Sequence, residues 1–200
     1  NLSNKILYMP YTKILPEVVI PSNTPRKKRF FLQKLAYFLL LFEDIRAVGS
    51  FLDNKRVIVV AAPHQSAKDE YLMILMILAM DIKISYLSAK WTMRKLPNPF
   101  IKSSDIDKQG IKWPLGWLQE KLFRRFGARP VDRKEGSGQY DSVIDELKKI
   151  DNFLLIITPE GRFDADRFRS SFVYLAKELE AEVMPVQIDY KNKQLKFLPP

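Results

Sequence analysis

The single histidine of the chain, His64, stands five residues before an aspartate, Asp69. An imidazole titrates near neutral pH and can take a proton from a hydroxyl, and a nearby carboxylate can orient the ring and stabilise the imidazolium that forms. The pair lies between the apolar run RVIVVAA, which is typical of a buried strand, and a long apolar run that is typical of a helix. The amino end of such a helix favours the neutral ring, which is the form that accepts a proton. These two residues therefore predict general-base chemistry on an attacking hydroxyl group.

The same residues admit two other interpretations. His64 could be an ordinary loop residue and Asp69 the acid of a capping box whose N-cap is Ser66, because a serine and an acid three residues apart often begin a helix. Ser66 could also be the nucleophile of a hydrolase with His64 and Asp69 as its partners, although the chain contains no Gly-x-Ser-x-Gly motif. Both alternatives stay open at this point.

Composition narrows the chemistry further. The chain contains no cysteine and one histidine, which excludes disulfides, thiol nucleophiles and zinc sites built on cysteine or histidine clusters, so we expect no bound metal. The formal net charge is +10, and a strongly basic chain favours an anionic partner such as an anionic membrane surface, a phosphorylated small molecule, an acidic carrier protein or nucleic acid. The chain has no helix-turn-helix, ribonucleoprotein or zinc-finger pattern, so nucleic acid is not expected as the partner.

The pattern of apolar residues predicts a single α/β domain with a mostly parallel central β-sheet flanked by helices. Strand-like runs alternate with helical patterns from Arg56 onward, and this alternation is typical of parallel sheets. We divide the chain into an N-terminal arm with a membrane-proximal helical segment, residues 1–50, and the α/β domain proper, residues 51–200. The predicted strands are RVIVVAA, IKISYLSA, ARPV, FLLIIT, EVMPVQI and QLKFL.

The stretch RKKRFFLQKLAYFLLLF, residues 26–42, places a basic cluster directly before aromatic and leucine-rich sequence. It predicts a helix over Arg26–Asp44 whose composition suits the interface of an anionic membrane. A core helix with a solvated basic amino end fits the same stretch equally well. The longest apolar runs, residues 35–42 and 71–80, are shorter than the ~20 residues that a membrane-spanning helix needs.

Three further stretches lie at or within predicted strands. GARPVDR, residues 127–133, ends in an Asp-Arg pair, and ITPEGRF, residues 157–163, contains a glycine that allows close backbone approach and an arginine that can hold a phosphate. MPVQIDY, residues 184–190, is a strand interrupted by a proline, Pro185. Singly, each has a structural explanation as a surface charge, a turn glycine, or an edge-strand or bulge proline.

In this order, PHQSAKD, GARPVDR, TPEGR and MPV resemble the four sequence blocks of the glycerophospholipid acyltransferase family, whose best-known members are the lysophosphatidate acyltransferases. The resemblance covers residues 56–190. It implies that His64 deprotonates the hydroxyl of the acceptor, that Asp69 supports His64, and that the hydroxyl oxygen attacks an acyl thioester directly. It also implies no bound cofactor, since acyl-CoA or acyl carrier protein (acyl-ACP) serves as a cosubstrate.

The later blocks carry the predicted substrate-binding residues. These residues are Arg133, Glu160, Gly161, Arg162 and Arg169. Arg133 ends the second block, and the resemblance implies that it contacts the phosphate of the acceptor. The third block is usually Pro-Glu-Gly-Thr-Arg, and because the threonine is absent here, Arg167 or Arg169 could replace Arg162 in phosphate recognition. The fourth block, residues 184–186, is implied to shape the acyl or acceptor pocket.

The function expected from these residues is transfer of a fatty acyl group from acyl-CoA or acyl-ACP to a phosphorylated glycerolipid acceptor, by a peripheral protein at the cytoplasmic face of a membrane. Two alternatives differ in class. The first is a non-catalytic basic module that binds an anionic membrane or another polyanion, which the net charge and the sequence RKKRFF favour. The second is a thioesterase or another hydrolase, which would use the same histidine and aspartate on water.

Overall fold

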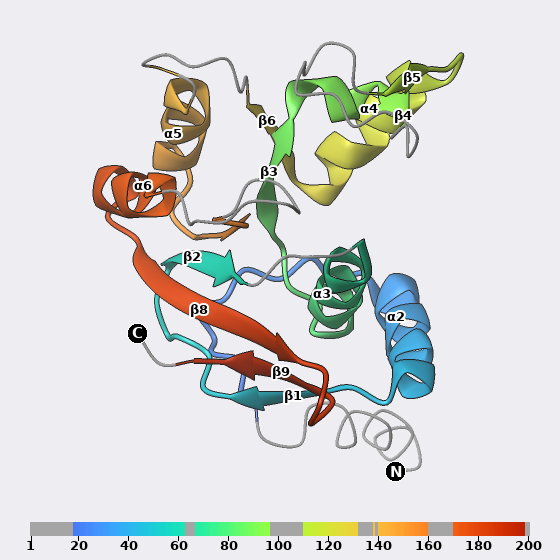
Figure 1. Cartoon of the computed structure of the whole chain (residues 1–200). Helices are drawn as coiled ribbons and strands as arrows, with labels where there is room; N and C mark the ends of the chain where they lie inside the picture. The colour runs from blue at the N-terminus through green and yellow to red at the C-terminus, as the bar shows by residue number, and fades with distance from the viewer. Residues whose placement is uncertain are drawn as a thin grey trace.

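The computed structural model of the chain describes residues 18–62, 67–96, 110–131, 138, 140–159 and 170–198 (Figure 1). The described segments form a central β-sheet with helices on both faces, which confirms the predicted α/β domain. The helices are α2 (Phe30–Glu43), α3 (Ala67–Ala79), the 3-10 turn η2 (Lys90–Met93), α4 (Gly116–Phe126), α5 (Asp141–Lys148) and α6 (Ser171–Leu179). The strands are β1 (Arg46–Gly49), β2 (Arg56–Ala61), β3 (Ser85–Ala89), β4 (Lys95–Leu96), β5 (Ile111–Lys112), β6 (Ala128–Val131), β7 (Phe153–Ile157), β8 (Glu182–Asp189) and β9 (Gln194–Phe197).

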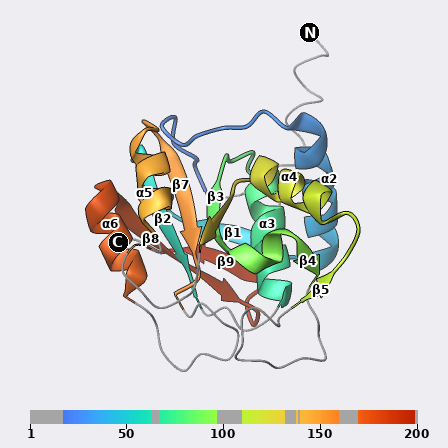
Figure 2. The same cartoon turned by 90° about the horizontal axis from the view of Figure 1, so that it is seen from above.

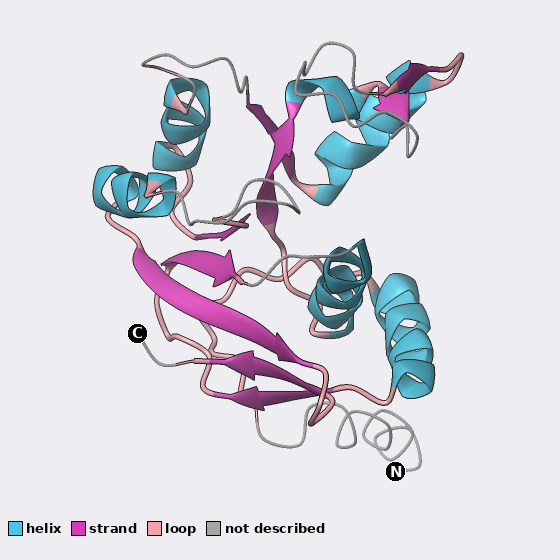
Figure 3. Cartoon of the chain, in the orientation of Figure 1, coloured by secondary structure: helices cyan, strands magenta, loops and turns pink. Residues whose placement is uncertain are grey.

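The large sheet has seven strands in the order β1-β9-β8-β2-β7-β3-β6, and β4 pairs with β5 in a separate two-stranded ribbon (Figure 3). Strands β2, β3, β6, β7 and β8 run parallel to one another, whereas β9 is antiparallel to β8 and parallel to β1. The carboxyl ends of the five parallel strands therefore meet at one edge of the sheet, which we call the carboxyl edge.

Helices cover both faces of this sheet, as the view from above shows (Figure 2). On one face α2 and α3 contribute buried side chains such as Leu40 and Met76. On the other face α5 and α6 contribute residues such as Leu147 and Leu175. Residues 57–61 of β2 are all buried as a result, and this two-sided burial explains why β2 is a continuous apolar run rather than an alternating one.

Helix α2 begins at Phe30, four residues later than the predicted start at Arg26. The backbone N–H groups of Lys28 and Arg29 donate hydrogen bonds to the carboxylate of Asp81, at 3.1 and 3.0 Å. Asp81 follows α3, so a residue from a neighbouring helix end satisfies donors at the amino end of α2. Lys28 has a left-handed backbone conformation with φ of +57°, so the right-handed helix begins only after the basic cluster.

The remaining differences from the sequence-based elements concern short strands. The strand expected over residues 82–89 begins at Ser85, and β1, β4 and β5 were not predicted. β4 and β5 contain two residues each, which is too short for an alternating pattern to be recognised, and β1, RAVG, has two apolar side chains among its four residues.

Gly127 joins α4 to β6 in a left-handed backbone conformation with φ of +103°. A Cβ atom at this position would lie 2.0 Å from the carbonyl oxygen of Ile84, so backbone strain and a collision both oppose a side chain. We expect Gly127→Ala to lower the free energy of unfolding by more than about 2 kcal/mol, measured by urea denaturation. Lys121→Ala, at an exposed position of α4, is the matched control and should change it by less than about 0.5 kcal/mol. Equal stability of the two variants would contradict this packing of α4 against the sheet.

Candidate functional site

The carboxyl edge of the sheet holds the ends of the strands that lead into three of the four sequence blocks. β2 ends at Ala61, β7 at Ile157 and β6 at Val131. Val60 pairs with Ile157 in parallel register, and Val131 pairs with Ala89, the last residue of β3. The chain therefore leaves the sheet at one edge just before the polar part of each block, and in parallel α/β sheets this is the edge where ligands collect.

Among the predicted site residues, Asp69 belongs to the described part of the chain. The others lie outside the described residues: His64, Arg133, Glu160, Gly161, Arg162 and Arg169. Ser66, the expected N-cap, and Arg167 lie outside them as well. The roles assigned to these residues therefore stay predictions, although the strands that precede them in the chain are described.

Asp69 is the third residue of α3 and is buried, with 5% of its surface exposed. The hydroxyl of Tyr190 donates a hydrogen bond to Asp69 Oδ1. A buried carboxylate is costly unless hydrogen-bond donors face it, and the dipole at the amino end of α3 adds a favourable field. The carboxylate is thus held in one place at the carboxyl edge, which is what orienting an imidazole requires.

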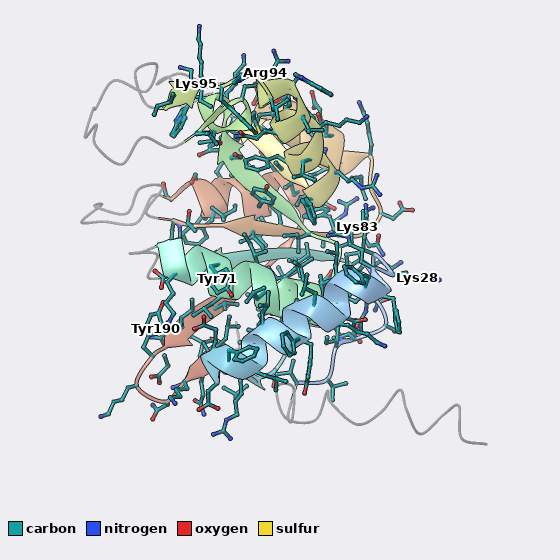
Figure 4. All side chains as sticks on the ribbon, turned by 90° about the vertical axis from the view of Figure 1, so that its right-hand side faces the viewer. Lys28, Tyr71, Lys83, Arg94, Lys95 and Tyr190 are labelled. Carbon is teal, nitrogen blue, oxygen red and sulfur yellow. The ribbon has the colours of Figure 1, made fainter. Side chains whose placement is uncertain are left out.

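Tyr190 was not predicted as a site residue, and the length of β8 explains its position. β8 pairs Val186 with Ala61, the last residue of β2, and then continues for three residues to Asp189. Tyr190 therefore follows a strand that projects beyond β2, and Figure 4 shows it at the end of the molecule where β8 approaches α3. The only signal in the sequence is the Asp-Tyr pair that ends MPVQIDY.

The turn after β8 restricts the backbone that carries Tyr190. The carboxylate of Asp189 accepts hydrogen bonds from Lys196 Nζ at 2.6 Å, from Asn192 Nδ2 at 2.8 Å and from the Asn192 backbone N–H at 3.0 Å. The bond from Lys196, followed by those from Asn192, holds the pKa of Asp189 well below its usual value. This carboxylate therefore keeps its charge further into the acid range than an ordinary aspartate, and it joins both strands of the β8–β9 hairpin to the turn.

The fourth block lies inside β8, which is an interior strand rather than an edge strand. Met184 is completely buried and Val186 nearly so, both on the face that packs against α2 and α3. The backbone of Val186 points toward β2, because its carbonyl accepts a hydrogen bond from the N–H of Ala62. The backbone of Pro185 points the other way, because its carbonyl accepts a hydrogen bond from the N–H of Leu198, beyond the end of β9. The missing N–H of Pro185 thus faces the end of the β8–β9 ladder, so the proline needs neither an edge strand nor a bulge.

A cavity of about 600 Å³ opens beside η2 and α4, next to the carboxyl ends of β3 and β6. Four of its lining residues are basic, namely Lys90, Arg94, Lys95 and Arg124. Glu120 forms ion pairs with Arg94 and with Arg124, and the hydrogen bond from Arg94 is the main reason that the pKa of Glu120 is lowered. This lining suits an anion such as phosphate, and within the described residues no three His, Cys, Asp or Glu side chains are grouped as a metal site would require. Asp69 does not line the cavity.

Comparison with known proteins supports the fold. The chain is similar in structure to the 1-acyl-sn-glycerophosphate (LPA) acyltransferase PlsC from Thermotoga maritima, with a TM-score of 0.50, and the match covers 86% of this chain and 67% of that chain. The sequence identity is 20%, so this likeness concerns the fold. No protein-family model matches the chain, and no curated protein matches its sequence. The predicted fold is therefore confirmed, and the roles of the four sequence blocks stay predictions.

Tyr190→Phe removes one hydroxyl and keeps the ring. Because the buried carboxylate of Asp69 then loses a donor, we expect the free energy of unfolding to fall by about 1–3 kcal/mol in urea denaturation at pH 7. Tyr174→Phe is the matched control, since Tyr174 is exposed on α6, and it should change stability by less than about 0.5 kcal/mol. If both variants are equally stable, the Tyr190 hydroxyl does not support Asp69.

Proposed function

We propose that this protein is an O-acyltransferase that moves a fatty acyl group from acyl-CoA or acyl-ACP to a hydroxyl of a lysophosphatidate-like glycerolipid. The order of the four blocks and the fold likeness to an LPA acyltransferase support this assignment. The observation that carries it is the burial of Asp69 at the carboxyl edge, with Tyr190 as a hydrogen-bond donor. A capping box accounts for an acid in the first turn of a helix, and it does not by itself account for a hydrogen-bond donor that comes from a distant strand.

In the proposed reaction His64 is the general base. It takes the proton of the acceptor hydroxyl while the hydroxyl oxygen attacks the carbonyl carbon of the thioester. The carbon–sulfur bond then breaks, and the imidazolium returns the proton to the departing thiolate, which leaves an ester and a free thiol. Asp69 orients the imidazole and stabilises its charge while it holds the proton. Tyr190 acts through Asp69 and is therefore a positioning residue.

Arginine residues that follow the same strands would bind the acceptor phosphate. Arg133 comes two residues after the end of β6, and Arg162 comes five residues after the end of β7. Guanidinium groups bind phosphate oxygens in pairs of parallel hydrogen bonds. Arg169 is the alternative to Arg162, and Glu160 and Gly161 complete the third block around them.

A membrane surface is the natural source of such an acceptor, and α2 has a face that suits it. Phe31, Phe38 and Phe42 expose 77, 54 and 74% of their surface, and Lys34 Nζ lies 4.2 Å from the centroid of the Phe30 ring. The opposite side of α2 packs on the core, so packing on the sheet leaves the aromatic side of the helix available for a membrane surface. We therefore propose peripheral association with the cytoplasmic face of an anionic membrane. None of the helices in the described part of the chain has the length and apolarity that crossing a bilayer requires.

His64→Ala should reduce acceptor-dependent thiol release by at least about 10²–10⁴-fold, because the chain offers no second imidazole. The measurement is thiol release from palmitoyl-CoA or an acyl-ACP thioester, with and without lysophosphatidate, followed with a thiol-reactive dye. The protein contains no cysteine, so every thiol detected comes from the donor. A circular dichroism spectrum and a urea curve like those of the wild type show that the variant is folded.

Each other outcome of this assay identifies a different function. Turnover of the His64→Ala protein close to that of the wild type would contradict the mechanism. Thiol release that needs no acceptor would identify a thioesterase or another hydrolase. No release from any donor, together with salt-dependent binding to polyanions, would identify the non-catalytic basic module.

Asp69→Asn should lower the same activity by about 10-fold or more, because the amide cannot stabilise an imidazolium as a carboxylate does. Asp145→Asn, at an exposed position of α5, is the matched control and should keep wild-type activity. The pH dependence of kcat/KM separates the proposed role from a structural one, since loss of the carboxylate lowers the pKa of the His64 imidazole and moves the acidic limb to lower pH. An unchanged limb at reduced activity would argue for a purely structural Asp69.

A further inference from the structure

Helix α4 turns an apolar face to the solvent. Leu115, which precedes the helix, and Trp117, Leu118 and Leu122 within it expose 45, 61, 44 and 49% of their surface. Leu115, Leu118 and Leu122 are spaced three and four residues apart and so share one stripe of the helix. Single exposed apolar residues are ordinary, whereas four on consecutive turns mark a surface that contacts something else.

The exposed side of α4 is also basic. Lys121, Arg124 and Arg125 are exposed, and the one acid of the helix, Glu120, is paired with Arg94 and Arg124. Apolar side chains, tryptophan included, that alternate with lysine and arginine are typical of helices that lie in the interface of an anionic bilayer. The charge and the apolar residues of α4 thus point to the same kind of partner.

The amino end of α2 and the carboxyl end of α4 meet at a cluster of cations. The guanidinium carbon of Arg29 lies 5.1 Å from the centroid of the Phe126 ring. Desolvation lowers the pKa of Lys27, and repulsion from Arg29, Lys83 and Arg125 lowers it further. Lys83 is labelled beside this end of α2 in Figure 4. Asp81 adds one carboxylate at this place, and the four cations outnumber it, so this surface attracts anions such as the phosphates of lipids.

Helices α2, α3 and α4 lie on the same side of the sheet, opposite α5 and α6 (Figure 2). Helix α3 adds Tyr71 and Ile74, which expose 40 and 46% of their surface, and Figure 4 shows Tyr71 on the side of the molecule that α2 and α4 also form. We call these exposed residues the docking face. Its members are Phe31, Phe38, Phe42, Tyr71, Ile74, Trp117, Leu118 and Leu122.

We propose that α4 is a second membrane-contact helix, and that the protein lies on an anionic bilayer through the whole docking face rather than through α2 alone. Trp117, Leu118 and Leu122 enter the interface, while Lys121 and Arg125 extend to lipid phosphates. A second copy of this chain is the less suitable occupant, because a symmetric dimer through this face would bring its cations against themselves. The proposal rests on the membrane association proposed above and extends it to α4. It is tested by vesicle binding, whereas acyl transfer is tested by thiol release, so either proposal can fail while the other is confirmed.

The first experiment is sedimentation with vesicles of phosphatidylcholine containing phosphatidylglycerol. We expect the double variant Trp117→Ser/Leu118→Ser to lower the partition coefficient at least about tenfold, as Phe31→Ser/Phe42→Ser on α2 should also do. The matched control is Val173→Ser/Tyr174→Ser, two adjacent exposed residues of α6 on the other side of the sheet, which should change binding less than about twofold. Binding of the α4 variant equal to that of the control would overturn the proposal.

The second experiment needs only a conservative substitution, so it stands even if the double variant fails to fold. Brominated phosphatidylcholine in the same vesicles should quench the tryptophan emission of the wild type, and Trp117→Phe should remove the largest quenched component. An equal quenched fraction in both proteins would overturn the proposal. Light scattering without lipid tests the other occupant: a wild-type dimer that the α4 variant abolishes would identify the face as a protein interface and would also overturn it.

Discussion

Parallel pairing of β2 between β7 and β8 is the constraint on which the rest of the structure depends. β2 contributes five buried residues, 57–61, and both of its backbone edges are paired along most of its length. A strand buried on both faces must have helices on both sides, and a parallel neighbour can be reached only through a crossover. These requirements bring the carboxyl ends of β2, β7 and β8 to one edge of the sheet.

The hydrogen bond from Tyr190 to Asp69 depends on the position at which β8 ends. Because β8 extends three residues past the end of β2, Tyr190 can donate to a carboxylate in the first turn of α3. The Asp189 turn and its bonds to Asn192 and Lys196 fix the direction of that extension. A hairpin at one side of the sheet and a helix that follows the central strand are thus joined through one buried acid.

Much of the fold could be predicted from the sequence, since β2, β6, β7 and β8 are strong apolar or β-branched runs and α5 has a regular amphipathic pattern. The start of α2 could not be predicted, because the N–H groups of Lys28 and Arg29 at its amino end donate to Asp81, which comes from a distant part of the chain. The motif order indicated the acyltransferase fold and the place of Asp69. Tyr190 could not be predicted as a site residue, because the pairing of β8 with β2 brings it to Asp69 and no local sequence pattern indicates that pairing.

The pairing of β1 with β9 has a consequence for how the protein is made. In the described sheet, β1 pairs with residues 194–197, which are far later in the chain. β2 likewise pairs with the later residues 153–157 and 182–186. A ribosome delivers the chain from its amino end, so α2, α3 and β2 leave the exit tunnel before the later strands that complete their core, and the faces that pack on those strands are uncovered until then. Docking of a nascent chain on a membrane or a chaperone would shield those surfaces, whereas the hydrogen bond to Asp69 can form only after Tyr190 has been translated.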